Sequence, residues 1–159
     1  KKGELKDKAY QQMLESAIQL NTPGIRLSEM EGVHALTDVT GYGLLGHLLE
    51  ICRGSKLQAR LEFDRVPILS AARHLVEAGY ATGASDRNWA SCQDAVSLPA
   101  SWPAWRRKIL TDPQTSGGLL VACDAATAPA VLEVFKQQEF KYATRIGTLS
   151  AGEPRITVE

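Results

Sequence analysis

The sequence lacks an excess of charge of either sign and lacks any long apolar run. Its 159 residues include 18 Lys and Arg side chains against 18 Asp and Glu side chains. Without a basic surplus, nothing indicates a surface for nucleic acid or for an anionic membrane. No apolar segment approaches the roughly 20 residues that span a bilayer, and no signal-peptide pattern is present. We therefore expect neither nucleic acid nor membrane as a partner.

Cysteine is also scarce. The three cysteines, Cys52, Cys92 and Cys123, are widely spaced and form no C-x-x-C pair. Three cysteines cannot pair completely, which argues against a disulfide framework, and the spacing argues against a zinc knuckle. A reducing, cytoplasmic location fits this usage, with the thiols serving as small buried hydrophobes.

Length and composition fit a globular domain with one core. Hydrophobic residues make up 44% of the chain and charged residues 23%, which are ordinary values for a globular fold. The chain begins Lys1-Lys2-Gly3, without an initiator methionine. A cut from a longer protein and a processed terminus would both explain this start, and the motifs described below favour the cut.

Hydrophobic periodicity predicts interleaved helices and strands. Residues 5–20 have the apolar spacing of an amphipathic helix, whereas residues 80–103 are rich in Gly, Ser, Asp and Asn and are predicted to form a long loop. Other helices are expected at 41–53, 68–78, 102–110 and from 127 onward, with a short turn near 27–31. Strands are expected at 33–39, 57–63, 118–123, 142–149 and 155–158. This order predicts an α/β (α+β) fold, a two-layer sandwich with a mixed sheet.

A glycine-rich turn follows the first predicted strand. Residues 41–46 read Gly-Tyr-Gly-Leu-Leu-Gly, a literal G-x-G-x-x-G, and Glu62 follows about 20 residues later. This is the nominal fingerprint of a dinucleotide-binding unit, and it predicts an oxidoreductase domain as one alternative.

Asp38 favours a different ligand for the same turn. Its carboxylate lies three residues before Gly41, where it would face a pyrophosphate and repel it unless a cation lay between them. Mg²⁺ prefers oxygen ligands and is commonly held by one or two carboxylates together with phosphate oxygens. The turn therefore also fits a magnesium–phosphate site with Asp38 as a metal ligand. A role for Asp38 as a helix cap stays open.

A second polar turn precedes the strand expected at 118–123. Residues 111–118 read Thr-Asp-Pro-Gln-Thr-Ser-Gly-Gly. The backbone N–H groups near Thr115, Ser116, Gly117 and Gly118, with the two hydroxyl groups, could form an anion-binding nest. The alternative is a tight turn that uses Asp-Pro and Gly-Gly for its geometry alone.

Taken together, these motifs resemble the signature of the selenophosphate synthetase (selenide, water dikinase) family. The resemblance rests on Asn21, on residues 31–47 (Glu-Gly-Val-His-Ala-Leu-Thr-Asp-Val-Thr-Gly-Tyr-Gly-Leu-Leu-Gly-His) and on residues 112–120. Residues 83–88, Gly-Ala-Ser-Asp-Arg-Asn, are similar to the family's loop of glycine, small residues and Arg-Asn. The resemblance runs from about Leu5 to the C-terminus.

The resemblance implies a fold like the C-terminal domain of aminoimidazole ribonucleotide synthetase. Residues 1–159 would be one C-terminal domain of a two-domain enzyme that converts selenide, ATP and water to selenophosphate, AMP and phosphate. The family's nucleophilic Cys or selenocysteine, its essential Lys and most of its metal-binding aspartates belong to an N-terminal ATP-binding domain that is absent from this chain. We therefore expect no catalytic residue here and no turnover by this chain alone.

The family's metal ligand maps onto Asp38, which would bind Mg²⁺ together with carboxylates from the absent domain. The residues expected to bind the nucleotide are Thr40, Gly41, Gly43, Thr115, Ser116, Gly117 and Gly118. The expected partners are ATP and selenide, and a second copy in a homodimer of the full-length protein. A non-catalytic regulatory domain with the same fold remains an alternative.

Three polar residues near the motifs have no assigned role. His47 could approach a phosphate or orient the turn by hydrogen bonding, although a structural histidine is the commoner case. Arg87 and Asn88 lie in the predicted long loop, where contacts to a substrate and ordinary loop packing are both open.

Overall fold

The computed structural model of the protein describes residues 5–159. Helices and strands interleave along this part of the chain, as predicted. In order they are α1 (Asp7–Ile18), α2 (Pro23–Ser28), β1 (Val33–Asp38), α3 (Gly43–Ser55), β2 (Leu57–Leu61), the 3-10 turn η1 (Phe63–Arg65), α4 (Ser70–Glu77), α5 (Gly83–Cys92), the 3-10 turn η2 (Gln93–Ala95), β3 (Val96–Ser97), α6 (Ala104–Leu110), β4 (Leu119–Cys123), α7 (Ala128–Gln137), β5 (Gly147–Ala151) and β6 (Ile156–Val158).

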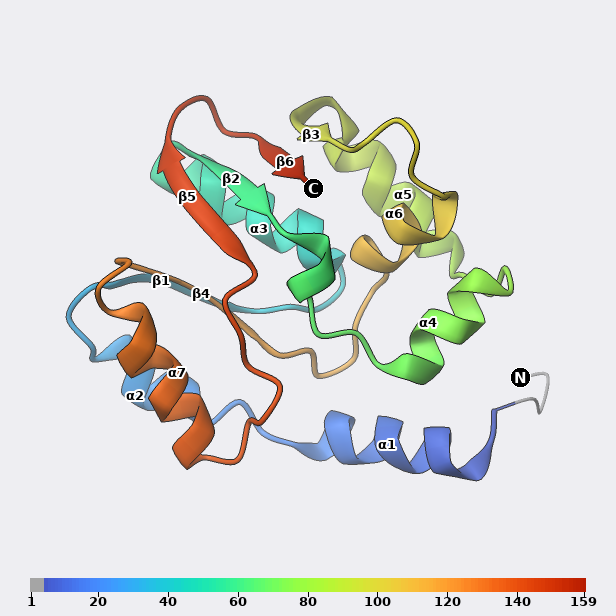
Figure 1. The fold of residues 1–159 in the computed structure, drawn as a ribbon, viewed down its shortest axis with the longest axis horizontal. Coiled ribbons are helices and arrows are strands. Elements are labelled where there is room, and N and C mark those ends of the chain that lie inside the picture. Colours follow the sequence, from blue (N-terminus) through green and yellow to red (C-terminus); the bar gives the residue numbers. More distant parts are fainter. Residues whose placement is uncertain (1–4) are drawn as a thin grey trace.

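The strands form two sheets. β1 pairs with β4 in an antiparallel ladder, and the other four strands lie in the order β3-β6-β2-β5. The four-stranded sheet is mixed, because β5 is antiparallel to β2 while β6 is parallel to both β2 and β3. In Figure 1, α2 and α7 lie beside the β1–β4 ladder on one side of the molecule, and α4, α5 and α6 lie on the other side. The predicted α/β fold with a mixed sheet is confirmed.

The register of β1 and β4 brings two distant segments together. Asp38 at the end of β1 is opposite Leu119 at the start of β4, and Val33 is opposite Cys123 at the other end. The residues that follow β1 and those that precede β4 therefore lie at the same end of the ladder. These are the two polar turns found in the sequence.

The pairing contradicts the dinucleotide-binding alternative. In that unit the strand before the glycine turn and the strand after its helix are parallel strands of one sheet. Here β1 and β2 flank α3 but belong to different sheets. The G-x-G-x-x-G at Gly41 is therefore not part of a dinucleotide-binding βαβ unit.

Two apolar clusters hold these layers together. The larger one surrounds α3, whose Leu45, Leu49 and Cys52 are almost fully buried against β2, β6 and α6. The smaller one joins α2 to α7 through Leu27, Val131, Val134 and Phe135, beneath β1 and β4. α3 is anchored along its apolar stripe, so its N-terminus holds the glycine turn in a fixed place.

The predicted loop at 80–103 is wrong, because this segment contains α5, η2 and β3. α5 begins at a hydroxyl cap, where the side-chain oxygen of Thr82 accepts a hydrogen bond from the Ser85 N–H at 3.3 Å. Small polar residues are typical of both loops and helix starts, and Ser85 is buried here by tertiary packing. Composition alone therefore could not separate a loop from a capped helix.

Other predicted boundaries move by a few residues. α3 continues through Gly54 to Ser55 and ends at Lys56, which has a left-handed backbone with φ of 55°. The strand expected at 142–149 begins only at Gly147. The two last strands do not pair with each other, because both flank β2.

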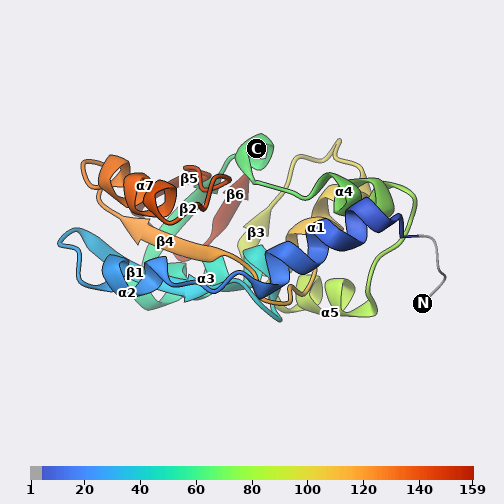
Figure 2. The ribbon, with the colours of Figure 1, turned by 90° about the horizontal axis from the view of Figure 1, so that it is seen from below.

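Helix α1 forms as predicted, but its apolar stripe is only partly covered. No residue of α1 is buried, and Tyr10, Met13 and Ile18 are exposed. Figures 1 and 2 both show α1 on the outside of the molecule. No helix within residues 5–159 has the length and apolar character that crossing a membrane requires.

Candidate functional site

The two polar turns pack directly against each other at the end of the β1–β4 ladder. The Val39 N–H donates to the Gly118 carbonyl at 3.0 Å, and the Gln114 N–H donates to the Thr40 carbonyl at 3.0 Å. The sequence placed the motifs about 70 residues apart, and the antiparallel pairing makes them one surface.

Two glycines allow this close approach. A Cβ atom at Gly117 would overlap the Val39 carbonyl oxygen and lie 2.7 Å from the Gln114 side-chain oxygen. A Cβ atom at Gly43 would lie 2.7 Å from the Thr111 carbonyl carbon, and Gly43 also has a positive φ of 68°. Gly41 and Gly118 have no atom within 4 Å of such a position. Of these four glycines, two thus pack the turns together and two leave open backbone.

Asp38 presents an exposed carboxylate at the edge of this surface. Its Oδ1 accepts a hydrogen bond from Asn21 Nδ2 at 2.9 Å. The same Nδ2 donates to the Gly117 carbonyl at 2.8 Å. Asp38 is therefore not a free surface carboxylate: one oxygen is held by Asn21, and Oδ2 accepts no hydrogen bond from residues 5–159. It also makes no side-chain cap to α3, which rules out the capping alternative.

Asn88 is a second asparagine that joins the two turns, at Gly41 and Thr111. Asn88 Nδ2 donates to the Gly41 carbonyl at 2.8 Å and to the Thr111 carbonyl at 2.9 Å. Asn88 comes from α5, the helix that composition did not reveal. Asn88 is half-buried and contacts both motifs, which shows a packing role; contact with a substrate stays a prediction.

Asp112 points away from the open surface and into a hydroxyl cluster. Its Oδ1 accepts hydrogen bonds from Ser85 Oγ at 2.7 Å and from Thr82 Oγ1 at 3.0 Å. These contacts tie the second turn to the start of α5. Sequence patterns did not predict this contact of Thr82 and Ser85, because their partner lies 27 to 30 residues away.

His47 is a structural residue that orients the first turn. It is buried, and its Nε2 accepts a hydrogen bond from the Thr40 backbone N–H at 3.0 Å. Because Nε2 is the acceptor, the neutral ring carries its proton on Nδ1, which has no hydrogen-bond partner within the described part of the chain. A direct contact between His47 and a ligand is therefore not needed to explain this residue.

The predicted binding residues lie on the two paired turns, and five of the seven are exposed. Thr40, Gly41, Thr115, Ser116 and Gly118 are exposed, while Gly43 and Gly117 are buried as spacers. Within residues 5–159, the backbone N–H groups of Gly41, Ser116 and Gly118 donate no hydrogen bond. Ser116 has a left-handed φ of 50°, as occurs in nests of backbone N–H groups. The surface thus offers N–H donors and hydroxyl groups beside one carboxylate, and nucleotide binding there stays a prediction.

The donor set fits a hard cation only in part. Asp38 Oδ2 and nearby carbonyl groups are oxygen donors of the kind Mg²⁺ prefers. In the part of the chain that the structure describes, no three His, Cys, Asp or Glu side chains group closely enough to hold a metal ion. The chain can therefore supply one carboxylate to such a site, and the remaining ligands have to come from elsewhere.

The cysteines take no part in this site. Burial raises the pKa of the Cys52 and Cys92 thiols above its ordinary value. Burial and the neighbouring Asp124 carboxylate raise the pKa of Cys123. Neutral, shielded thiols are poor nucleophiles, in agreement with their prediction as packing residues.

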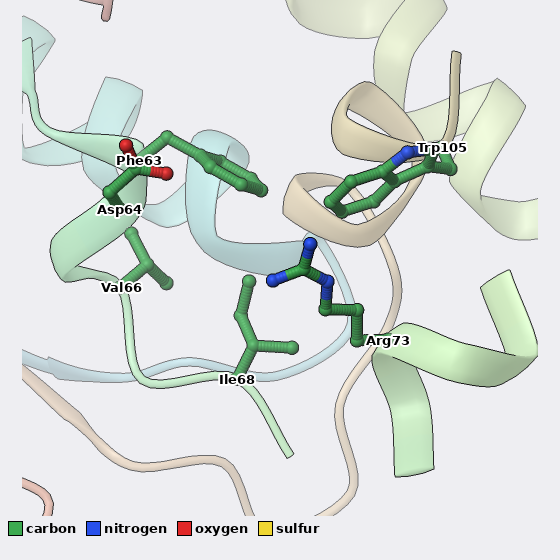
Figure 3. Close-up of a pocket in the computed structure, with 6 residues that line it drawn as sticks. All are labelled: Phe63, Asp64, Val66, Ile68, Arg73 and Trp105. Carbon is green, nitrogen blue, oxygen red and sulfur yellow. The ribbon is translucent and has the colours of Figure 1, made fainter. Parts of the chain in front are cut away.

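A cavity of about 150 Å³ lies elsewhere, between η1, α4 and α6. Figure 3 shows its lining residues Phe63, Asp64, Val66, Ile68, Arg73 and Trp105. The Arg73 guanidinium lies 5.2 Å from the Trp105 ring centroid and pairs with Glu77 at 2.9 Å. None of the predicted site residues borders this cavity.

Comparison with protein families gives a match over nearly the whole chain. Residues 2–159 match the model of the AIR synthase related protein, C-terminal domain. The chain is 49% identical over 158 residues to a selenide, water dikinase of Dechloromonas aromatica (strain RCB) and 48% identical to one of Pseudomonas straminea. These alignments cover 99% of this chain but only 45% and 44% of the relatives, so the chain spans less than half of their length.

Solved structures show the same fold at lower identity. A thiamine-monophosphate kinase from Stenotrophomonas maltophilia K279a superposes with a TM-score of 0.57 at 22% identity, over 87% of this chain and 34% of the kinase. The hydrogenase maturation protein HypE, in a crystal structure with ATP, superposes with a TM-score of 0.60 at 20% identity, over 86% of this chain and 33% of that protein. At such identities the likeness establishes the fold alone.

Proposed function

The chain belongs to the AIR synthase related protein C-terminal domain family, and from this premise we propose that it is the C-terminal part of a selenide, water dikinase. The whole enzyme would convert selenide, ATP and water to selenophosphate, AMP and phosphate. The identity of 45–49% to dikinases across 158 residues supports this choice of activity. The observation that carries the role of this part is the Asp38 carboxylate, held beside two open backbone turns.

In this proposal Asp38 supplies one oxygen ligand to Mg²⁺ bound with ATP. Oδ1 is already held by Asn21, so Oδ2, which accepts no hydrogen bond from residues 5–159, is the atom available to the cation. Mg²⁺ would neutralise charge on the phosphate oxygens. Its other protein ligands would come from the part of the enzyme that this chain does not include.

The turns would bind the nucleotide phosphates through backbone donors. Gly41 begins the turn before α3, and Ser116 and Gly118 lie on the second turn. All three present unpaired N–H groups among the described residues. Fixed donors cost no reorganisation when negative charge develops, which is how such groups favour phosphoryl transfer. The hydroxyls of Thr40, Thr115 and Ser116 border the same surface.

Among residues 5–159, no cysteine thiol lies near these turns to act as the nucleophile. The three thiols are buried or half-buried with raised pKa values, and none lies on either turn. The chemistry would therefore depend on an N-terminal part, which we expect to supply the nucleophile. The chain on its own would fold without turning over substrate. The cytoplasmic location and the homodimer that the resemblance implies remain proposals.

A chimaera tests this function. Residues 2–159 would replace the matching C-terminal portion of the Dechloromonas aromatica dikinase, and AMP release would be measured with ATP, Mg²⁺ and selenide. We expect selenide-dependent AMP from the chimaera and none from the 159-residue chain alone.

Two results would contradict the proposal. Turnover by the 159-residue chain alone would show that the chemistry does not need the missing part. A chimaera that folds cooperatively but releases no AMP would show that this chain cannot serve as the C-terminal part of a dikinase.

A further inference from the structure

The two turns are joined by two asparagines that come from different elements. Asn21 follows α1, and its Nδ2 bridges Asp38 Oδ1 and the Gly117 carbonyl at 2.9 and 2.8 Å. Asn88 lies in α5, and its Nδ2 bridges the Gly41 and Thr111 carbonyls at 2.8 and 2.9 Å. Each amide thus donates two hydrogen bonds, one to an acceptor on each side of the paired turns.

The chemistry of the acceptors fixes the orientation of both amides. Carbonyl and carboxylate oxygens only accept hydrogen bonds, so each asparagine has to present its nitrogen and not its oxygen. The two N–H bonds of a carboxamide diverge in one plane from a single atom. Two acceptors that share this atom are therefore held at a set separation, which a hydroxyl group with one hydrogen could not achieve.

We infer that Asn21 and Asn88 are positioning residues that lock the two turns into one rigid binding surface. Asn21 acts on a side chain, because it holds Oδ1 of Asp38 and leaves Oδ2 without a hydrogen bond from residues 5–159. Asn88 acts on backbone alone, because both of its acceptors are main-chain carbonyls. The relevance of this lock to ligand binding rests on the proposed function, whereas the lock itself does not.

Cross-turn hydrogen bonds provide local reporters for each bridge. The Val39 N–H donates to Gly118 next to the Asn21 bridge, and the Gln114 N–H donates to Thr40 next to the Asn88 bridge. The Ala59 N–H, which donates to Arg155 in the four-stranded sheet, reports on global unfolding. Amide hydrogen exchange of the 159-residue chain measures all three together.

Asn21→Ala should lower the exchange protection of Val39 about tenfold or more, and Asn88→Ala should do the same at Gln114. A tenfold change corresponds to about 1.4 kcal/mol, within the range expected for two lost hydrogen bonds. Gln19→Ala and Arg87→Ala remove exposed side chains from the same two segments and should change neither reporter. Asn88→Asp keeps the side-chain shape without the donors, so it should resemble Asn88→Ala.

Three results would overturn the lock. Protection at Val39 and Gln114 could stay unchanged, it could fall equally at Ala59, or Asn88→Asp could behave like the parent chain. The second result would mean that the asparagines support only overall stability. The third would mean that shape, and not hydrogen-bond donation, is what the fold requires.

A second measurement links the lock to the proposed metal role. Mn²⁺ would be titrated into the 159-residue chain while NMR follows line broadening of amides near Asp38. We expect Asn21→Ala to require several-fold more Mn²⁺ for half-broadening, and Asn88→Ala to require less of an increase. If the parent chain broadens and Asn21→Ala does not differ from it, Asn21 does not position Asp38. If the parent chain shows no broadening near Asp38, the cation needs the ligands of the missing part, and the same comparison of variants is made in the chimaera by the Mg²⁺ dependence of AMP release; hydrogen exchange decides the lock in either case.

Discussion

Alanine should destabilise the fold at Gly117 of the second turn but should be tolerated at the adjacent Gly118. Gly117→Ala places a Cβ on the Val39 carbonyl, 2.7 Å from the Gln114 side-chain oxygen and 2.9 Å from the Val39 carbonyl carbon. Most of these atoms belong to backbone and cannot turn aside. Gly118→Ala meets no atom within 4 Å, and the backbone at Gly118 has no positive φ that would penalise a side chain.

The free-energy cost of Gly117→Ala comes from overpacking and from the separation of the two turns. Overpacking of this kind costs about 1–3 kcal/mol. Moving the turns apart also weakens the Val39–Gly118 and Asn21–Gly117 hydrogen bonds, each with a net value of about 0.5–1.5 kcal/mol. We expect a loss of about 3 kcal/mol from the free energy of unfolding, a large share of the roughly 5–15 kcal/mol of a typical domain.

Urea denaturation of the 159-residue chain measures the difference. With a slope of about 2 kcal/mol per molar urea, Gly117→Ala should lower the midpoint by about 1.5 M. Gly118→Ala should leave it within about 0.5 M of the parent, because alanine restricts the unfolded chain without strain in the folded one. Equal midpoints for the two variants would refute the account of how the turns pack together.

Three further perturbations test neighbouring parts of the structure. Gly43→Ala should destabilise the chain by about 3 kcal/mol in the same assay, because the φ of 68° at Gly43 and its close approach to Thr111 both exclude a side chain. Gly41→Ala should be tolerated, because a Cβ there meets no atom. Similar free-energy costs for the two variants would contradict the assignment of Gly43 as a spacer and Gly41 as an open position. His47→Leu should cost about 1–3 kcal/mol and lower the exchange protection of the Thr40 amide, since this buried side chain accepts that N–H; an unchanged Thr40 amide would show that His47 serves packing alone. The pKa values of Cys52, Cys92 and Cys123 are raised, so the folded chain holds less thiolate at neutral pH than the unfolded chain does. Iodoacetamide should therefore label the folded chain slowly at pH 7 and faster as pH rises past the ordinary pKa of a thiol. Because the folded chain has the higher thiol pKa values, the contribution of these groups to stability is present below the unfolded thiol pKa and is lost as pH rises through the raised values. Labelling of the folded chain at the unfolded rate at pH 7 would contradict the burial of these thiols.

The sequence predicted most of the elements because their patterns are local. The apolar stripe of α3, the alternation in β2 and the proline at the start of α7 are signals of a few residues each, and the structure bears out all three. The stripe of α1 predicted its helix equally well, yet it could not show that residues 5–159 bury none of this stripe fully. Periodicity reports which residues share a face, and not what covers that face.

The parts that sequence patterns missed depend on long-range contacts. α5 was hidden because its small polar residues are stabilised by Asp112, which is distant in the chain. The strand order β3-β6-β2-β5 separates β1 from β2, and only this pairing excludes the dinucleotide interpretation of Gly41 and Gly43. Asn21 and Asn88 belong to the motifs that resemble the family, but the sequence could not show their bridging role, since their acceptors lie on turns that meet only when β1 pairs with β4.

The role of Asp38 is the centre of the proposed function, and one comparison of two carboxylates tests it. In the chimaera with the Dechloromonas aromatica dikinase, Asp38→Asn keeps the side-chain shape and the acceptor for Asn21 while it removes the charge. Asp124→Asn makes the same change on an exposed carboxylate beyond Cys123, at the opposite end of the β1–β4 ladder. Selenide-dependent AMP release would be measured across a Mg²⁺ titration. We predict that Asp38→Asn lowers the rate by at least about 100-fold and shifts the Mg²⁺ requirement upward, since a lost charge at a cation site costs several kcal/mol, while Asp124→Asn retains the chimaera's rate. Equal rates for the two variants would contradict the assignment of Asp38 as a metal ligand.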